Sequence, residues 1–414
     1  MTTKRNHVDT HRSHATVPAA LIGLLVLTVI ATAVPAAASA PVAHHPGTET
    51  AAAPAGSPGR RVVPGADGHI AVRPDGKVFA TVSGMTVKQW NTATGRRGGP
   101  VIAAGAGAVH AVAFSSDGEL LAVAGDGGVS LWDAATGRRS GAPLTGHAGP
   151  VRSVSFSSTD DLLATSGDDG TVRVWDAATG RPVRTLTGHS GPVGSVVFSR
   201  DGKRLAAAGT DDTVRLWTAA TGRPIGGALT VNPGPVYAMS FSPDGKLLAA
   251  SGGNDVVRLW NPATGEPAGE PIVTGAGPVY ALTFSLGRKN LLATSSGADN
   301  TVRLWDTATR TPAALPLTGH TGPVRAMRFS LDGDLLATGS DDGTVRLWDA
   351  ATGSPEGLPL TGHDGPVWAL RFSPNGKRVI TAGDDDTVRL WRVKSAGAAA
   401  RSGAGTGHHL VRMR

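Results

Sequence analysis

The chain has 414 residues, of which 39 are Lys or Arg and 32 are Asp or Glu, and it contains no cysteine. The net charge of +7 arises at the two ends: residues 1–60 carry four basic side chains against two acidic ones, residues 393–414 carry four against none, and the body carries 31 against 30. A nearly neutral body argues against a basic surface for nucleic acid. The absence of cysteine excludes disulfide bonds and anchoring through a lipidated cysteine.

The first predicted element is an export signal in residues 1–38. Three basic residues precede an apolar run from Pro18 to Val34, and the small residues PAAASA follow it. This arrangement indicates a secretory signal peptide that is cleaved after Ala38. The alternative is a retained membrane anchor formed by residues 18–34, since 17 residues are at the short limit for a membrane span. Both readings predict an extracytoplasmic protein, either secreted or anchored in the cell membrane.

Residues 39–59 are rich in Ala, Pro and Gly and are predicted to form a flexible linker. The basic tail, residues 393–414, has no strand pattern and is predicted to be disordered. Each of these segments contains a pair of neighbouring histidines, but no carboxylate or third histidine lies at a supporting spacing. We therefore expect solvated histidines there and no metal site.

Between these two segments a tryptophan recurs at intervals of 42 to 45 residues. The eight positions are Trp90, Trp132, Trp175, Trp217, Trp260, Trp305, Trp348 and Trp391. A period of about 40 to 45 residues with Trp at one phase is typical of a β-propeller in which each repeat supplies one four-stranded blade. The body, residues 60–392, is therefore predicted to be a single all-β array.

Residues 147–187 show how one repeat is built. Four short strands are predicted at residues 151–156, 161–166, 171–176 and 181–186, each bounded by Gly, Asp, Pro or Ser. Apolar and polar residues alternate along the strands, so each strand presents one face to a neighbouring blade. No repeat could bury both faces alone, which predicts a closed ring of repeats.

The repeat resembles the WD-repeat β-propeller family, since TGH precedes the first strand and GSDDGTVRLWDAATG spans the third. The resemblance covers residues 60 to 392 and implies a propeller that binds a protein or peptide. It also implies a hydrogen-bonded tetrad of His, Ser or Thr, Asp and Trp in each blade. Transferred by position, the tetrad is complete in three units: His147, Thr165, Asp169 and Trp175; His320, Thr338, Asp342 and Trp348; His363, Thr381, Asp385 and Trp391.

The other units depart from this tetrad. Ala207 in the fourth unit and Ala122 in the second are assigned to the hydroxyl position. In the fifth unit Asn232 and Asn254 replace the His and the Asp, and Gly84 replaces the Asp of the first. Buried charge-assisted hydrogen bonds contribute about 1.5 to 3 kcal/mol each. The three complete units are therefore expected to be the stiffer ones.

Eight sets of first to third strands can be counted, beginning with the degenerate stretch at residues 69–90. Only seven fourth strands lie between consecutive tryptophans, and the chain after Trp391 has no strand pattern. Arg60 to Pro64 resembles Arg181 to Leu186 and is predicted to close the ring as the outer strand of the last blade. The prediction is an eight-bladed propeller, with seven blades and a loose first repeat as the alternative.

Catalytic motifs are not found in this sequence. It lacks a G-x-S-x-G elbow, a phosphate-binding loop ending in Lys and Ser or Thr, and an H-E-x-x-H pair. The repeated Asp pairs, such as Asp168 and Asp169, are assigned to turns and tetrads because they lack the ligand spacing of a calcium loop. We therefore expect a non-catalytic scaffold without a cofactor. The alternative is an exported eight-bladed enzyme such as a quinone-cofactor dehydrogenase, which the near-identity of the repeats disfavours.

One position of the repeat gathers unusual side chains, directly after the first Val of each first strand. It holds His110, Arg152, Gly194, Tyr237, Tyr280, Arg325 and Trp368, which include both tyrosines and the one tryptophan outside the repeat positions. The spacing of apolar residues predicts a β-bulge beside Val236. In WD-repeat proteins the matching position lies at the channel mouth where peptides dock. The residues predicted to bind the partner of a monomeric protein are therefore His110, Arg152, Tyr237, Tyr280, Arg325 and Trp368. The alternative is that the aromatic residues only plug a wide channel.

Overall fold

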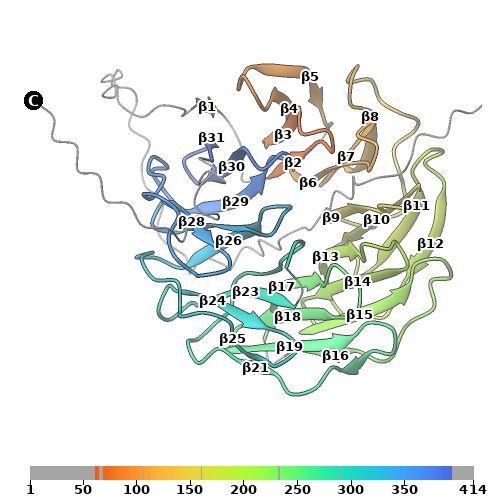
Figure 1. The fold of residues 1–414 in the computed structure, drawn as a ribbon. Coiled ribbons are helices and arrows are strands. Elements are labelled where there is room, and N and C mark those ends of the chain that lie inside the picture. The colour runs from red at the N-terminus through yellow and green to blue at the C-terminus, as the bar shows by residue number, and fades with distance from the viewer. Residues whose placement is uncertain are drawn as a thin grey trace, which may run out of the picture.

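The computed structural model describes residues 61–64, 69–105, 107–159, 161–231, 234–288 and 290–393. These residues form an all-β ring of eight blades without helices, so that no helix in these ranges could cross a membrane. The first strands lie near the centre of the ring and the fourth strands at its periphery (Figure 1). The predicted signal or anchor, the linker and the basic tail concern residues outside these ranges.

The first four blades follow the chain, with antiparallel neighbours in sequence order. Blade 1 contains β2 (Ile70–Val72), β3 (Val78–Ser83), β4 (Thr86–Asn91) and β5 (Arg97–Ala103); blade 2 contains β6 (Val109–Phe114), β7 (Leu120–Gly125) and β8 (Gly128–Asp133); blade 3 contains β9 (Val151–Phe156), β10 (Leu162–Gly167), β11 (Val172–Asp176) and β12 (Pro182–Leu186); blade 4 contains β13 (Val193–Phe198), β14 (Arg204–Gly209), β15 (Thr213–Thr218) and β16 (Leu229–Thr230).

The last four blades repeat the plan with shorter outer strands. Blade 5 contains β17 (Val236–Phe241), β18 (Leu248–Gly252), β19 (Val256–Asn261), β20 (Glu266–Pro267) and β21 (Ile272–Val273); blade 6 contains β22 (Leu282–Phe284), β23 (Leu291–Ser295), β24 (Val302–Asp306) and β25 (Thr311–Pro312); blade 7 contains β26 (Val324–Phe329), β27 (Leu335–Ser340) and β28 (Val345–Asp349); blade 8 contains β29 (Val367–Phe372), β30 (Arg378–Gly383) and β31 (Thr387–Arg392). In blades 2 and 7 the outer segment pairs only through isolated bridges.

The ring is closed by β1 (Arg61–Pro64), which pairs with β31 as the outer strand of blade 8. The register runs from Arg61 opposite Leu390 to Pro64 opposite Thr387. Blade 1 in turn packs against blade 8, where Phe79 and Ile380 share one buried cluster. The eight-bladed prediction is confirmed, and the seven-bladed alternative is wrong because the degenerate first repeat still forms a packed blade.

The core is divided among the interfaces between neighbouring blades. In the cluster between blades 2 and 3, for example, Leu131 packs with Leu163 and Trp175, all of which are at most 1% exposed. Corresponding clusters occupy every interface of the ring. Each blade thus buries both faces only through its neighbours, as the alternating pattern predicts.

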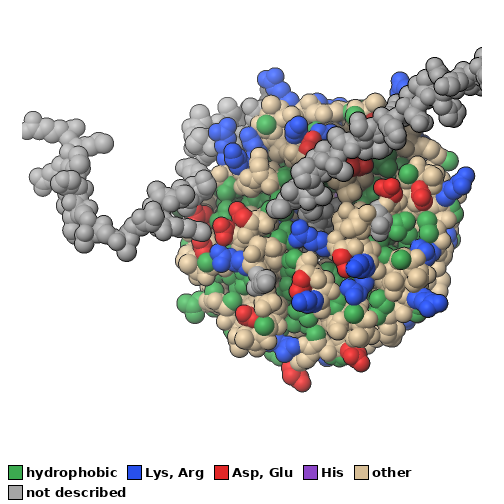
Figure 2. Space-filling model, turned by 45° about the vertical axis from the view of Figure 1, so that its right-hand side comes forward, with side chains coloured by type: hydrophobic (Ala, Val, Ile, Leu, Met, Phe, Trp, Pro, Cys, Tyr) green, Lys and Arg blue, Asp and Glu red, His purple; other side chains and the backbone are tan. Residues whose placement is uncertain are grey.

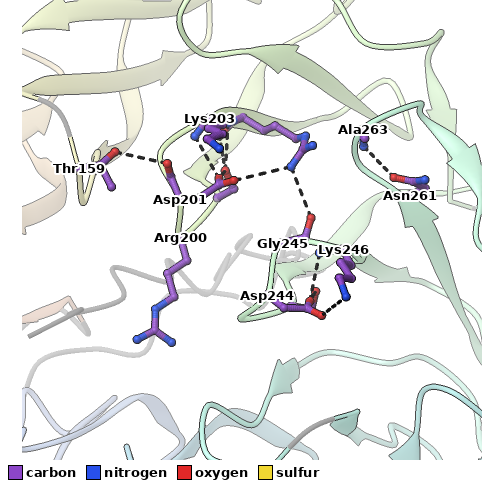
Figure 3. A network of polar contacts seen from close by, with 12 residues as sticks. Thr159, Arg200, Asp201, Lys203, Asp244, Gly245, Lys246, Asn261 and Ala263 are labelled. Atoms are coloured by element: carbon purple, nitrogen blue, oxygen red, sulfur yellow. Dashed lines mark hydrogen bonds and ion pairs between the residues drawn. The ribbon is translucent and has the colours of Figure 1, made fainter. Parts of the chain in front are cut away.

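The ring has two distinct faces. The upper face is formed by the turns between second and third strands and by the connections that lead into each first strand, and the lower face by the remaining turns. On the lower face, adjacent turns are joined from blade to blade (Figure 3): Thr159 Oγ1 donates to the carbonyl of Asp201 at 3.4 Å, and Arg204 Nη1 donates to that of Gly245 at 3.5 Å. Because β1 is antiparallel to β31, residues 61 and 393 both lie toward this lower face.

Candidate functional site

The complete tetrads form a relay of hydrogen bonds across the strands of one blade. In blade 3 the indole N–H of Trp175 donates to Thr165 Oγ1 at 2.9 Å, and Thr165 Oγ1 lies 2.8 Å from His147 Nε2. His147 Nδ1 lies 3.0 Å from both carboxylate oxygens of Asp169. The same relay occurs in blade 7 and blade 8: His320, Thr338, Asp342 and Trp348; His363, Thr381, Asp385 and Trp391.

Burial and hydrogen bonding set the charge states of this relay. Burial alone would raise the pKa of Asp169, but hydrogen bonds from Ala148, His147 and Thr171 outweigh it and lower the pKa to about 2. Burial also lowers the pKa of His147, against the opposing effect of Asp169. A neutral imidazole can donate from Nδ1 to the carboxylate and accept at Nε2 from the threonine hydroxyl.

The incomplete blades lack different members of the relay. In blade 4, His189 Nδ1 keeps its contact with Asp211 at 2.9 Å, but His189 Nε2 is buried with no hydrogen-bond partner because Ala207 replaces the threonine. In blade 2 the assignment of Ala122 to the hydroxyl position is wrong. The strand register places Val123 at this position. The segment from Val123 to Trp132 is one residue shorter than the equivalent segment from Thr165 to Trp175 in blade 3.

Blades 1 and 6 keep part of the relay. The indole N–H groups of Trp90 and Trp305 donate to Thr81 and Thr294, both at 2.9 Å. In blade 5 the side chain of Asn254 accepts from the backbone N–H of Val256 at 3.0 Å. The assignment of Asn232 to the histidine position lies outside the described residues.

We expect Ala207→Thr to stabilise the protein, because the new hydroxyl would supply the partner that His189 Nε2 lacks. The expected gain is about 0.5 to 1.5 kcal/mol, the net contribution of one hydrogen bond. Ala250→Thr is the matched control, since it adds the same side chain at the same position in blade 5, where Asn254 replaces the aspartate. Thermal unfolding should show a higher midpoint for Ala207→Thr alone; equal shifts in both variants would contradict the assignment.

The predicted partner-binding residues all lie where the first strands begin, close to the upper face. The register of the first strand against the second shifts at six positions of this phase, including beside Val236 as predicted: His110, Arg152, Gly194, Tyr237, Arg325 and Trp368. A bulge re-aims its side chain, which here frees the residue from the alternating pattern of the sheet. We call the set His110, Arg152, Gly194, Tyr237, Tyr280, Arg325 and Trp368 the mouth ring.

Four neighbouring members of the mouth ring form a continuous stack over blades 5 to 8. The rings of Tyr237 and Tyr280 lie 5.4 Å apart between centroids. The guanidinium carbon of Arg325 lies 4.0 Å from the ring centroid of Tyr280 and 5.6 Å from that of Trp368. Arg325 also contacts the carboxylate of Asp341 at 2.8 Å. The sequence prediction thus gathers residues that the structure brings into direct contact.

The mouth ring is ionic over blades 2 and 3. His110 Nε2 lies 2.6 Å from the carboxylate of Asp126, and Arg152 Nε donates to Asp168 at 2.8 Å. Arg152 Nη1 lies 3.3 Å from His110 Nε2, so the two pairs are adjacent. The hydrogen bond from His110 lowers the pKa of Asp126, and that from Arg152 lowers the pKa of Asp168. Gly194 of blade 4 leaves a gap between this sector and the aromatic one.

Sequence reasoning missed the role of the first aspartate in each repeated pair. The second aspartate belongs to the tetrad, whereas the first, in Asp168, Asp341 and Asp384, contacts the mouth-ring residue of its own blade. The sequence contained a regularity that could have revealed this role. The aspartate and the mouth-ring residue that it contacts are 16 residues apart in all three blades. Such a contact also requires the two side chains to point toward each other at the bulge, which spacing alone does not specify.

Charge is distributed unequally between the two faces. Among the described residues of the upper-face turns and connections, every Lys, Arg, Asp or Glu is an aspartate. Apart from the aspartates at the tetrad position of each blade, these are Asp126, Asp168, Asp212, Asp255, Asp341, Asp364, Asp384 and Asp386. Basic side chains reach this face only from the strands, as where Arg303 pairs with Asp299 at 2.7 Å. On the side of the molecule drawn in Figure 2, Lys and Arg side chains are interspersed with Asp and Glu side chains.

Comparison with known proteins identifies the repeat. The family model for the WD domain, G-beta repeat, matches residues 101–133, 139–176, 180–218, 227–261, 269–306, 313–349 and 356–392. Blade 1, built from the degenerate first repeat, is outside these matches except for the end of β5. No curated protein matches the sequence. Among solved structures, the computationally designed Ika8 protein is similar, with a TM-score of 0.67 and 24% identity over 80% of this chain and 97% of its own.

Proposed function

Because the chain belongs to the WD40 repeat family, we propose that it is a non-catalytic scaffold that binds a protein or peptide at the mouth ring on its upper face. Propellers of this family generally bind other proteins, and a rigid ring that presents loops on one face suits that role. The partner would contact side chains supplied by several blades at once.

The observation that carries this proposal is the contact stack of Tyr237, Tyr280, Arg325 and Trp368. Tyr, Trp and Arg are the residues most enriched in binding hot spots, because each combines a large contact area with a hydrogen-bonding group. All four are partly exposed, although they lie in a protein whose other tryptophans are mostly buried. The competing explanation is that the aromatic rings only fill the centre of an eight-bladed ring.

Replacing Tyr237, Tyr280, Arg325 and Trp368 with alanine should abolish partner capture and leave the melting temperature nearly unchanged, since the four side chains are only partly buried. Capture would be measured by pull-down from a cell-envelope fraction with the purified propeller, followed by mass spectrometry. The control carries Leu315→Ala and Leu358→Ala, which remove two leucines that are 85% and 87% exposed outside the mouth ring. Survival of capture, or unfolding of the fourfold variant, would support the filling role.

We also propose that the protein is exported and monomeric, with residues 1–38 as its signal or residues 18–34 as a retained anchor. Residues 61 and 393 lie toward the lower face, so a membrane tether at the N-terminus would leave the upper face accessible. N-terminal sequencing of the envelope and secreted fractions tests this, and an intact Met1 in the soluble cytoplasmic fraction would contradict it.

A further inference from the structure

The sector of the upper face around Trp368 combines an aromatic surface with uncompensated negative charge. We infer that the segment bound there is cationic: an extended stretch of a partner protein that presents arginine or lysine beside Trp368. This inference rests on the proposed function, because it specifies the chemistry of the partner at the mouth ring.

The negative charge of this sector comes from Asp364, Asp384 and Asp386 of blade 8. All three are exposed, and none forms an ion pair within the described part of the chain. Asp384 accepts the indole N–H of Trp368 at 3.3 Å, which places a carboxylate beside the aromatic ring. A cation bound here would gain both the attraction of three carboxylates and contact with the indole face.

Arg325 shows how this surface holds a guanidinium group. Its guanidinium carbon lies near the rings of Tyr280 and Trp368, and its nitrogen atoms contact the carboxylate of Asp341 at 2.8 to 3.1 Å. Trp368 with Asp384 offers an incoming side chain the same combination of aromatic ring and carboxylate. Arginine is favoured at such a site because its planar group can stack and form paired hydrogen bonds.

An anionic segment would be disfavoured at the same place. The upper-face turns and connections carry no Lys or Arg in the described ranges, and the two arginines of the mouth ring already pair with carboxylates, Arg152 with Asp168 and Arg325 with Asp341. A neutral segment of the partner would bury contact area there but would gain no attraction from the carboxylates. Charge complementarity therefore selects a basic partner, and steering by the aspartates would make association depend on salt.

The test uses the full-length protein and three labelled peptides of Gly and Ser, which carry arginine, glutamine or glutamate at the same positions. Binding is measured by fluorescence anisotropy at low and at physiological salt. We expect the arginine peptide to bind about tenfold more tightly than the glutamine peptide at low salt, the glutamate peptide to bind least, and the difference to shrink with salt.

Two variants with the same change in net charge locate the site. Asp364→Asn, Asp384→Asn and Asp386→Asn together should weaken binding of the arginine peptide about tenfold. The control carries Asp117→Asn, Asp244→Asn and Asp332→Asn in the corresponding lower-face turns, where blade 8 itself has Asn375. It should bind like the unmodified protein.

The outcomes separate this inference from the proposed function. Equal weakening by both triple variants, or equal binding of the three peptides, overturns the cationic preference. If partner capture is still lost in the fourfold mouth-ring variant, the docking site stands and only the chemistry of its ligand is wrong. If the glutamate peptide binds more tightly than the arginine peptide, and if this binding disappears in the fourfold mouth-ring variant, the docking site again stands and the cationic preference is wrong. Loss of arginine-peptide binding in the upper-face variant and in Trp368→Ala, but not in the lower-face control, supports the inference.

Discussion

A chain that lacks residues 1–68 is expected to unfold at a temperature roughly 5 to 10 °C below that of the full chain and to self-associate. The deletion removes β1, which pairs with β31 along four residues. Loss of its hydrogen bonds costs about 3 to 5 kcal/mol at about 1 kcal/mol each. It also exposes the edge of β31 to pairing with other chains.

A chain that begins at residue 60 is the matched control, because it lacks the N-terminal segment but retains β1. Thermal unfolding and light scattering would be compared for the two truncated proteins and the full chain. The shorter truncation should behave like the full chain. If the two truncated proteins unfold at the same temperature and neither self-associates, β1 does not close the ring.

The second large effect is expected for Asp342→Ala in blade 7. The Asp342 carboxylate contacts His320 Nδ1 at 2.9 Å and accepts from the backbone N–H of Thr321 at 2.9 Å and of Thr344 at 2.8 Å. Burial would raise the pKa of Asp342, but these hydrogen bonds outweigh it and hold the pKa well below its usual range. Removing the carboxylate leaves several buried donors without a partner and should cost about 3 to 5 kcal/mol.

Asn254→Ala provides the comparison, because Asn254 occupies the corresponding position of blade 5, where a neutral amide replaces the carboxylate. Both proteins would be unfolded by heat and by urea at neutral pH. The midpoint should fall further for Asp342→Ala, and the slope of the urea transition should remain unchanged. Equal shifts would show that the tetrad does not hold the blades together.

The architecture was accessible from the sequence because a propeller blade is a local unit. The tryptophan period defines each repeat, and the alternation around Thr165 fixes which residues face a neighbouring blade. The hydroxyl position of blade 2 was wrongly assigned to Ala122 instead of Val123, because counting back from Trp132 assumes a constant turn length and the turn of blade 2 is shorter. Only the strand register resolves such a difference.

The site was predictable in part. Clustering of the rare aromatic residues at one phase of the repeat identified Tyr237, Tyr280 and Trp368, because repeats hold equivalent positions at equivalent places in a ring. The pairing of Arg325 with Asp341 depends on the direction of the two side chains at the bulge, which the apolar spacing does not specify. The excess of aspartates on the upper face was not predicted, because the nearly neutral charge of the body does not show on which face its charged residues lie.

The pairing of β1 with β31 also sets an order of events during synthesis. The ribosome produces β1 first and its partner last, with more than 300 residues between them. At about 5 to 20 residues per second, β1 waits on the order of half a minute before β31 emerges. Blades 2 to 7 can pack against one another in that time, but the ring cannot close. Joining of the two ends is therefore the final step of folding, and any process that retains the N-terminal segment also delays completion of the propeller.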